Sequence, residues 1–233
     1  MRFDHCAQTY DAYAAPQRAF AARVAEFIHA GAETDVIELG AGTGALTRTV
    51  CAATRVAVHA TDASTAMVNL GRENVPEARW SRLDAFVELV PQSQLQLSSG
   101  LLQWAPDPER VLRKWKAALR PGGRMVHALP CEPCLREWRR LVPEGPVRWR
   151  DQAAWSLLFE AAGLKVSRKH LWVDTMLFPS ALDMIRAMHR SGVTGHPRLG
   201  PGRLRQAMRR YEAEHRVPGA IEATWAWLAI EAR

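Results

Sequence analysis

The chain has 233 residues, of which 48% are apolar, so it is long enough to bury a substantial core within one domain. It contains no run of about 18 apolar residues, no apolar signal segment after Met1, and only four cysteines, so we expect a cytoplasmic protein without a membrane span or a disulfide framework. The net charge of +7 favours an acidic partner, unless it reflects only an arginine-rich surface.

The first predicted helix covers residues 16–30, and Gly31 ends it. Apolar side chains recur through it at helical spacing: Phe20, Val24, Phe27 and Ile28. We expect residues 1–30 either to fold over a ligand site as a lid or to form a frayed terminus.

The stretch from Val36 to Gly44 predicts a buried strand, a glycine-rich turn and the start of a helix. Glycines alternate at Gly40, Gly42 and Gly44, which lets a ligand approach the backbone and the positive end of the following helix. Dinucleotides and S-adenosylmethionine both bind such turns. Glu38 favours S-adenosylmethionine, because a carboxylate there would repel a pyrophosphate and tolerate a sulfonium and an ammonium.

Two acids follow the next two predicted strands. Residues 56–61 form the second strand and end at Asp62, where a carboxylate can accept hydrogen bonds from the two hydroxyls of a ribose. Residues 79–83 form the third strand, which is followed by Asp84. Asp62 alone would also suit a helix cap, but beside the glycine turn we interpret it as a ligand-binding residue.

The remaining elements alternate between strands and helices, which predicts a mostly parallel sheet of seven strands with helices on both faces. In chain order they are strand 95–98, the rim segment 99–104, helix 108–119 ended by residues 120–123, strand 124–129, a proline-broken arginine-rich segment 130–150, helix 151–162, strand 164–173, two helices beginning at Pro179 and Pro201, and strand 220–232. We therefore predict a single α/β domain over 1–233. Its parts are an N-terminal helix or lid (1–30), a ligand-binding core (31–174), a helical insertion (175–217) and a final strand (218–233).

These motifs resemble the class I methyltransferases, whose motif I is E-x-G-x-G-x-G. Over nearly the whole chain the sequence is similar to the malonyl-acyl-carrier-protein O-methyltransferases of biotin synthesis. The segments that carry this resemblance are Phe3-Asp4 with Tyr10-Asp11, Leu101-Leu102-Gln103-Trp104, Phe178-Pro179-Ser180-Ala181 with Ile185-Arg186, and Thr224-Trp225. The chain departs from that family at Ser99, where the family has Asn, and at His189 and Trp225, where the family has Lys and Tyr.

The resemblance implies S-adenosylmethionine as the cofactor, acyl carrier protein as the partner, and methylation of the free carboxylate of a malonyl thioester. The residues expected at the cofactor are Glu38, Gly40, Ala41, Gly42, Gly44, Asp62, Ala63, Met67, Asp84, Ala85 and Ser98. Tyr10 is expected to act at the reacting groups. Arg148 is expected to bind the substrate carboxylate, because a guanidinium matches two oxygens.

Other functions stay open at this point. They are methylation of another small carboxylate or of RNA, and a non-catalytic subunit with the same fold. Cys131-Glu132-Pro133-Cys134 is a lone pair of cysteines without further ligands, so we expect neither a metal nor a redox site. Most of the nine tryptophans fall at core spacing, which disfavours a surface for stacking nucleic-acid bases.

Overall fold

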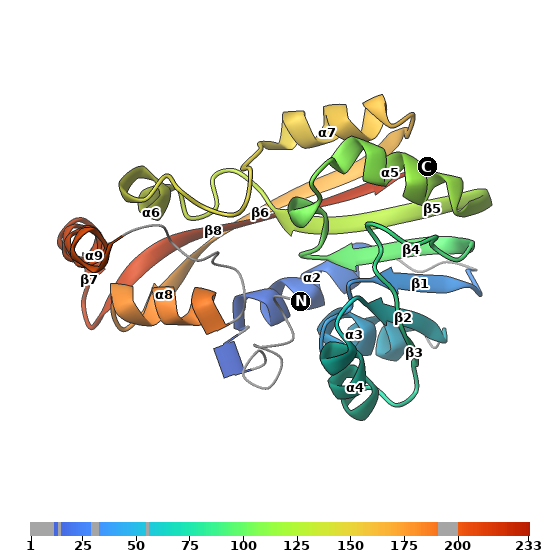
Figure 1. Ribbon diagram of the computed structural model, residues 1–233, viewed down its shortest axis with the longest axis horizontal. Helices are drawn as coiled ribbons and strands as arrows, with labels where there is room; N and C mark the ends of the chain where they lie inside the picture. Colours follow the sequence, from blue (N-terminus) through green and yellow to red (C-terminus); the bar gives the residue numbers. More distant parts are fainter. Residues whose placement is uncertain (1–11, 14, 29–32, 55, 191–199) are drawn as a thin grey trace.

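The computed structural model describes residues 12–13, 15–28, 33–54, 56–190 and 200–233. One twisted sheet runs through the molecule, with strands in the order β3-β2-β1-β4-β5-β8-β6 and the short β7 paired to β8 (Figure 1). The strands are β1 (Val36–Leu39), β2 (Val58–Asp62), β3 (Arg79–Arg82), β4 (Ser93–Ser99), β5 (Leu119–Pro130), β6 (Val166–Phe178), β7 (Arg216–Val217) and β8 (Ala220–Ala232).

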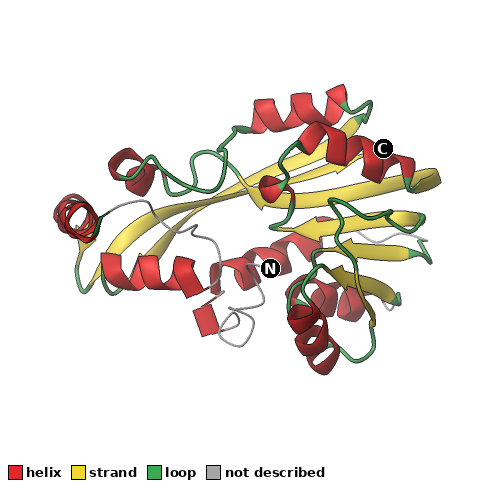
Figure 2. Cartoon of the chain, in the orientation of Figure 1, coloured by secondary structure: helices red, strands yellow, loops and turns green. Residues whose placement is uncertain are grey.

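The helices cover both faces of this sheet (Figure 2). They are α2 (Ala15–Ile28), α3 (Ala45–Thr54), α4 (Thr65–Asn74), α5 (Pro108–Ala117), α6 (Arg136–Leu141), α7 (Gln152–Ala161), α8 (Ala181–Arg190) and α9 (Pro201–His215), with a 3-10 turn at Leu102–Trp104. None of the helices in this part of the chain is long and apolar enough to cross a bilayer.

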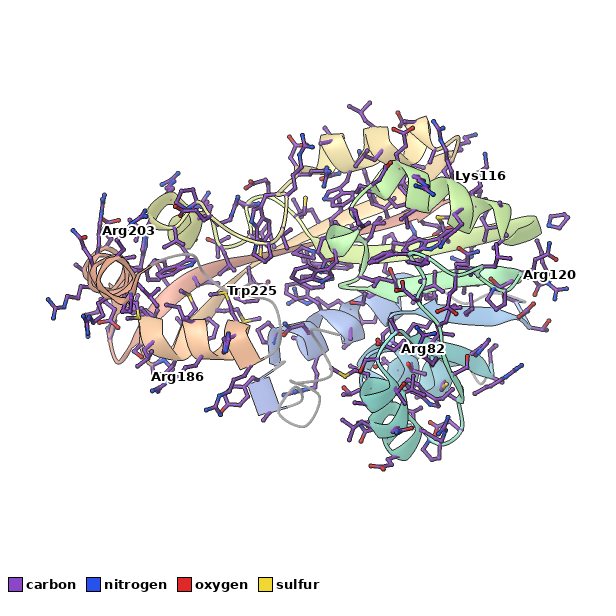
Figure 3. The ribbon with its side chains drawn as sticks, viewed as in Figure 1. Arg82, Lys116, Arg120, Arg186, Arg203 and Trp225 are labelled. Carbon is purple, nitrogen blue, oxygen red and sulfur yellow. The ribbon has the colours of Figure 1, made fainter. Side chains whose placement is uncertain are left out.

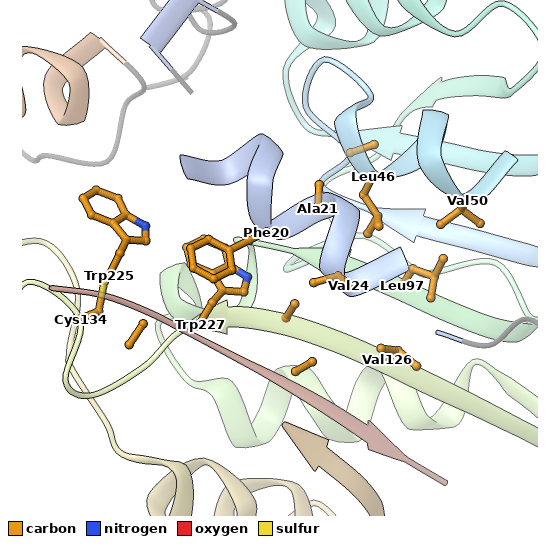
Figure 4. Close-up of a cluster of buried hydrophobic side chains, with 14 of the residues drawn as sticks. Phe20, Ala21, Val24, Leu46, Val50, Leu97, Val126, Cys134, Trp225 and Trp227 are labelled. Atoms are coloured by element: carbon orange, nitrogen blue, oxygen red, sulfur yellow. The ribbon is translucent and has the colours of Figure 1, made fainter. Parts of the chain in front are cut away.

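Successive side chains of a strand point to opposite faces of the sheet, so the buried side chains form two separate cores. On β8, Trp225 and Trp227 face one core together with α2 and α3, whereas Leu228 and Ile230 face the other core together with α5 and α7. Figure 4 shows the first core, in which the ring of Phe20 on α2 stacks on Trp227 with 5.2 Å between ring centroids. The last strand therefore holds α2 onto the sheet.

The predicted fold class is confirmed, including the parallel sheet from β3 to β5 and the helices on both faces. The last strand is inserted between β5 and β6 and runs antiparallel to both. Because β1, β2 and β3 are parallel, an acid at the end of β2 or β3 lies at the same edge of the sheet as the glycine turn after β1.

Three segments differ from the sequence-based prediction. Residues 119–123 do not end a helix outside the sheet but begin β5, whose pairing with β4 shifts register at Ser93 and Leu95 to accommodate them. Strand β6 continues to Phe178, because β8 pairs with it as far as Ile221. The segment 130–150 also contains a helix, α6, which its prolines and charges concealed.

A substitution at Gly71, a buried glycine, can test the packing beside the glycine turn. A Cβ on Gly71 of α4 would lie 2.2 Å from the ring of Trp80, whose indole nitrogen donates to the carbonyl of Val75 at 3.0 Å. We expect Gly71→Ala to lower the free energy of unfolding by about 1–3 kcal/mol, because this clash outweighs the roughly 1 kcal/mol that alanine gains in a helix. Urea denaturation measures the change.

The matched control is Gly145→Ala, where a Cβ meets nothing within 4 Å. We expect it to change stability by no more than about 0.5 kcal/mol. Equal effects of the two substitutions would contradict the packing described for Trp80.

Candidate cofactor site

The glycine turn between β1 and α3 forms one wall of the site. Gly40, Gly42 and Gly44 all adopt positive φ angles, of 66°, 57° and 92°. A Cβ on Gly40 would lie 2.8 Å from the side chain of Leu101, whereas one on Gly42 would meet nothing within 4 Å. Gly40 thus permits close packing of the rim against the turn, and Gly42 leaves open the space that a ligand would occupy.

Asp62 fastens this turn to the end of β2. One carboxylate oxygen accepts a hydrogen bond from the backbone N–H of Gly42 at 2.9 Å, and the other accepts from the N–H of Ser64 at 2.8 Å. The N–H of Ala41 also donates to the carbonyl of Thr61 at 2.8 Å. Each carboxylate oxygen has a second lone pair, so Asp62 can hold the loops and still accept from a ligand hydroxyl.

Asp84 occupies the corresponding position after β3. Its carboxylate accepts from the N–H of Phe86 at 3.0 Å, and the carbonyl of Ala85 accepts from the indole nitrogen of Trp115 at 2.9 Å. The N–H of Leu83 donates to the carbonyl of Asp62 at 2.9 Å. These bonds fix the two acid-bearing loops relative to each other.

Together these loops enclose a pocket of about 290 Å³ at the carboxyl edge of the parallel strands. Its walls are Gly40, Gly42, Asp62, Ala63, Ser64, Met67, Leu83, Asp84, Ala85, Phe86, Ser99, Gly100, Leu101 and Trp104. These described wall residues include two aspartates and no lysine, arginine or histidine. Such a wall suits a ligand with hydroxyl and amino groups and a positive charge, and it disfavours a pyrophosphate.

The structure brings seven of the predicted cofactor residues together in this wall: Gly40, Gly42, Asp62, Ala63, Met67, Asp84 and Ala85. It adds Ser64, Leu83 and Phe86, which the sequence analysis missed although each is a close neighbour of a predicted acid. The rim segment 99–104 contributes Ser99, Gly100, Leu101 and Trp104.

Four predicted cofactor residues do not line the pocket. Ala41 is buried, and the space beside Gly44 is filled by Val75 and Trp80. Ser98 is fully buried, and its hydroxyl lies 2.8 Å from Nδ1 of His127, on the opposite side of β4 from Ser99. Burial lowers the pKa of His127 to about 3, so this pair is an uncharged part of the core.

Glu38 is the fourth of these residues. It lies beneath the glycine turn, only 1% exposed, and its carboxyl accepts a hydrogen bond from the hydroxyl of Thr47 at 2.6 Å. Burial raises the pKa of Glu38 to about 8, so the group is largely protonated at neutral pH. Glu38 therefore lies beneath the pocket wall, whose described acids are Asp62 and Asp84.

Of the two residues expected at the substrate, Arg148 is not part of this wall. Tyr10 lies outside the described residues. Arg148 is exposed on the segment after β5, where its carbonyl accepts a hydrogen bond from the guanidinium of Arg150 at 3.3 Å. No group of three or more His, Cys, Asp or Glu in the described residues is arranged to hold a metal ion.

Comparison with known proteins supports the same interpretation. The model of the methyltransferase domain family matches residues 37–125, which span the glycine turn, both acids and the rim. A solved protein from Bacillus halodurans, assigned as a methyltransferase, superposes with a TM-score of 0.69 over 92% of this chain and 98% of that chain, at 12% identity. The protein has the class I methyltransferase fold.

Two curated relatives show a higher sequence identity to this chain. It is 30% identical to the malonyl-[acyl-carrier protein] O-methyltransferase of Priestia megaterium over 54% of this chain and 48% of that protein. It is 36% identical to the trans-aconitate 2-methyltransferase of Variovorax paradoxus over 48% of this chain and 45% of that protein. The matched region thus spans about half the length of these relatives. The family match and the pocket together support S-adenosylmethionine as the cofactor.

Asp62 provides a direct test of the pocket. We expect Asp62→Asn to weaken binding of S-adenosylhomocysteine about tenfold, because the amide keeps only one acceptor oxygen and loses the charge. Isothermal titration calorimetry measures the dissociation constant. Asp107→Asn is the matched control, since Asp107 only caps α5 through the N–H of Arg110. An unchanged dissociation constant in Asp62→Asn would contradict the role given to this carboxylate.

Glu38 makes stability depend on pH. Its folded pKa, about 8, lies above the ordinary value of 4.5, so its stabilising contribution is complete below about pH 4.5 and is lost as the pH rises towards 8. Glu38→Gln keeps an acceptor for Thr47 but cannot ionise. We expect the stability of the wild type, relative to Glu38→Gln, to fall by a few kcal/mol between pH 5 and pH 8. Urea denaturation at each pH measures it, and a constant difference between the two proteins would refute the assignment.

Proposed function

We propose that this protein is an S-adenosylmethionine-dependent O-methyltransferase that methylates the free carboxylate of a malonyl thioester on acyl carrier protein, an early step of biotin synthesis. The observation that carries the proposal is the chemistry of the pocket wall. Its described residues include no histidine, lysine, cysteine or tyrosine that could serve as a general base, and both aspartates are engaged with backbone N–H groups.

A carboxylate substrate does not need such a base. With an ordinary pKa near 4, it is already ionised and nucleophilic at neutral pH. The cofactor supplies an electrophilic methyl group on a sulfonium. Methyl transfer from it to a carboxylate oxygen would give a methyl ester and a neutral thioether and would need no proton transfer.

The chain's own residues then have two tasks, which are alignment and exclusion of water. Asp62 and the turn at Gly42 fix the ribose end of the pocket, and Asp84 fixes the other end. Leu101 and Trp104 form an apolar rim, which suits a reaction in which two opposite charges disappear. Tyr10 and Arg148 remain our proposed contacts to the substrate.

The names of the curated relatives support a carboxylate as the methyl acceptor, since malonyl and trans-aconitate groups both carry one. The malonyl thioester is favoured by the segments Leu101-Leu102-Gln103-Trp104 and Phe178-Pro179-Ser180-Ala181, which resemble that family. A free small carboxylate such as trans-aconitate is the second candidate, because the relative with that name shows the higher identity.

Transfer of a labelled methyl group tests the proposal. The purified protein is incubated with methyl-labelled S-adenosylmethionine and, separately, malonyl-carrier protein, trans-aconitate or tRNA. We expect label on the malonyl-carrier protein, released by mild alkali as a methyl ester must be. Methylation of trans-aconitate alone would replace the substrate, methylation of tRNA alone would overturn the carboxylate chemistry, and failure to bind S-adenosylhomocysteine would indicate a non-catalytic protein.

A further inference from the structure

A second hollow lies on the surface far from the glycine turn, between α6 and α9 (Figure 1). It has a volume of about 240 Å³. Its walls are Arg140, Leu141, Val142, Arg203, Gln206, Ala207 and Arg210, and we call it the α6–α9 groove. In Figure 3, Arg203 lies at this end of the molecule, opposite Lys116 and Arg120.

The wall of the α6–α9 groove combines three arginines with the apolar residues Leu141, Val142 and Ala207. Its walls include three arginines and no acid. Arg140 has no ion pair within the described part of the chain, while Arg203 and Arg210 make exposed pairs with Glu144 at 3.5 Å and Glu214 at 2.7 Å. Exposed pairs of this kind contribute little, so the arginines can exchange them for the acids of a partner.

The contacts that α9 and the pocket rim make with β8 indicate how far apart these two parts lie. The buried Tyr211 of α9 donates a hydrogen bond to the carbonyl of Glu222 on β8 at 2.9 Å. Five residues further along β8, the ring of Trp227 lies 3.5 Å from where a Cβ on Gly100 would be, and Gly100 lines the cofactor pocket. Five strand residues span about 17 Å, which separates the β8 contact of α9 from the β8 contact of the pocket rim, so we expect a partner in the groove to present its reacting group on an arm.

We propose that the α6–α9 groove docks an acidic helix of the carrier protein, which delivers its malonyl thioester to the pocket on its flexible prosthetic arm. This inference rests on the proposed function and names the surface at which its partner binds. A helix with acids along its flanks and small apolar residues between them matches arginine edges around Leu141, Val142 and Ala207. Nucleic acid would satisfy the arginines but not Leu141, Val142 and Ala207.

The sequence of α9 offers a matched pair of variants on opposite faces of one helix. Arg203 and Arg210 are seven residues apart and face the groove. Arg205 and Arg209 are exposed on the other side of the helix and do not line it. The double variants Arg203→Glu/Arg210→Glu and Arg205→Glu/Arg209→Glu therefore change the net charge equally at different faces.

Both variants are assayed with malonyl-carrier protein and with malonyl-coenzyme A, which presents the same thioester on a free arm. We expect Arg203→Glu/Arg210→Glu to raise KM for the carrier protein at least about tenfold, with kcat and the KM for malonyl-coenzyme A nearly unchanged. Added salt should raise KM for the carrier protein in the wild type and much less in this variant. Arg205→Glu/Arg209→Glu should behave like the wild type.

Equal effects of the two double variants, or an unchanged KM in Arg203→Glu/Arg210→Glu, would overturn the docking surface. Binding of the carrier protein, followed by fluorescence anisotropy, separates this failure from failure of the proposed function. If the wild type methylates neither thioester, the proposed function fails. In that case, the docking surface is supported only by an anisotropy result in which the wild type binds the carrier protein and the Arg203→Glu/Arg210→Glu variant does not. Loss of tRNA binding in that variant, with carrier binding intact, would assign the groove to nucleic acid and overturn the inference.

Discussion

The carboxylate of Asp62 is the interaction on which the geometry of the site depends. It joins the N–H of Gly42 to the N–H of Ser64, and thus the turn after β1 to the start of α4. Both N–H groups lie outside the regular hydrogen bonding of helices and strands and donate to Asp62 instead. Without this carboxylate they would have to bind water. The same carboxylate faces the pocket. Rigidity of the loops and recognition of the ligand therefore come from one side chain.

A buried ion cluster stabilises the opposite end of the sheet. Arg124 of β5 pairs with Glu33 at 2.7 Å and with Glu231 of β8 at 3.5 Å, and it donates to the carbonyl of Ile28 at 3.0 Å. Arg168 of β6 pairs with the same Glu231 at 2.9 Å. This cluster joins the end of α2 to three strands. Together with the stacking of Phe20 on Trp227, it fixes α2 along the face of the sheet that borders the pocket.

The sequence predicted most of the fold because the turn signals and acids recur at strand ends, and the parallel topology then places them at one edge. It could not show that Glu38 lies beneath the pocket wall, because all four residues of β1 are buried and a strand buried on both faces shows no alternation. For the same reason it could not show that Ser98 points into the core, since β4 is buried on both faces around that position. The length of β6 was also hidden, because Asp174 and Thr175 interrupt its apolar residues before Met176.

Acidic and basic side chains line two separate hollows. The cofactor pocket, at the carboxyl edge of the parallel strands, is lined by Asp62 and Asp84 without a basic residue, and the α6–α9 groove carries three arginines without an acid. In the proposed docking, this charge pattern orients an acidic carrier protein with its acids at the groove and away from the pocket before specific contacts form. The proposed arrangement therefore favours a carboxylate that is carried away from the acidic surface of the carrier on an arm.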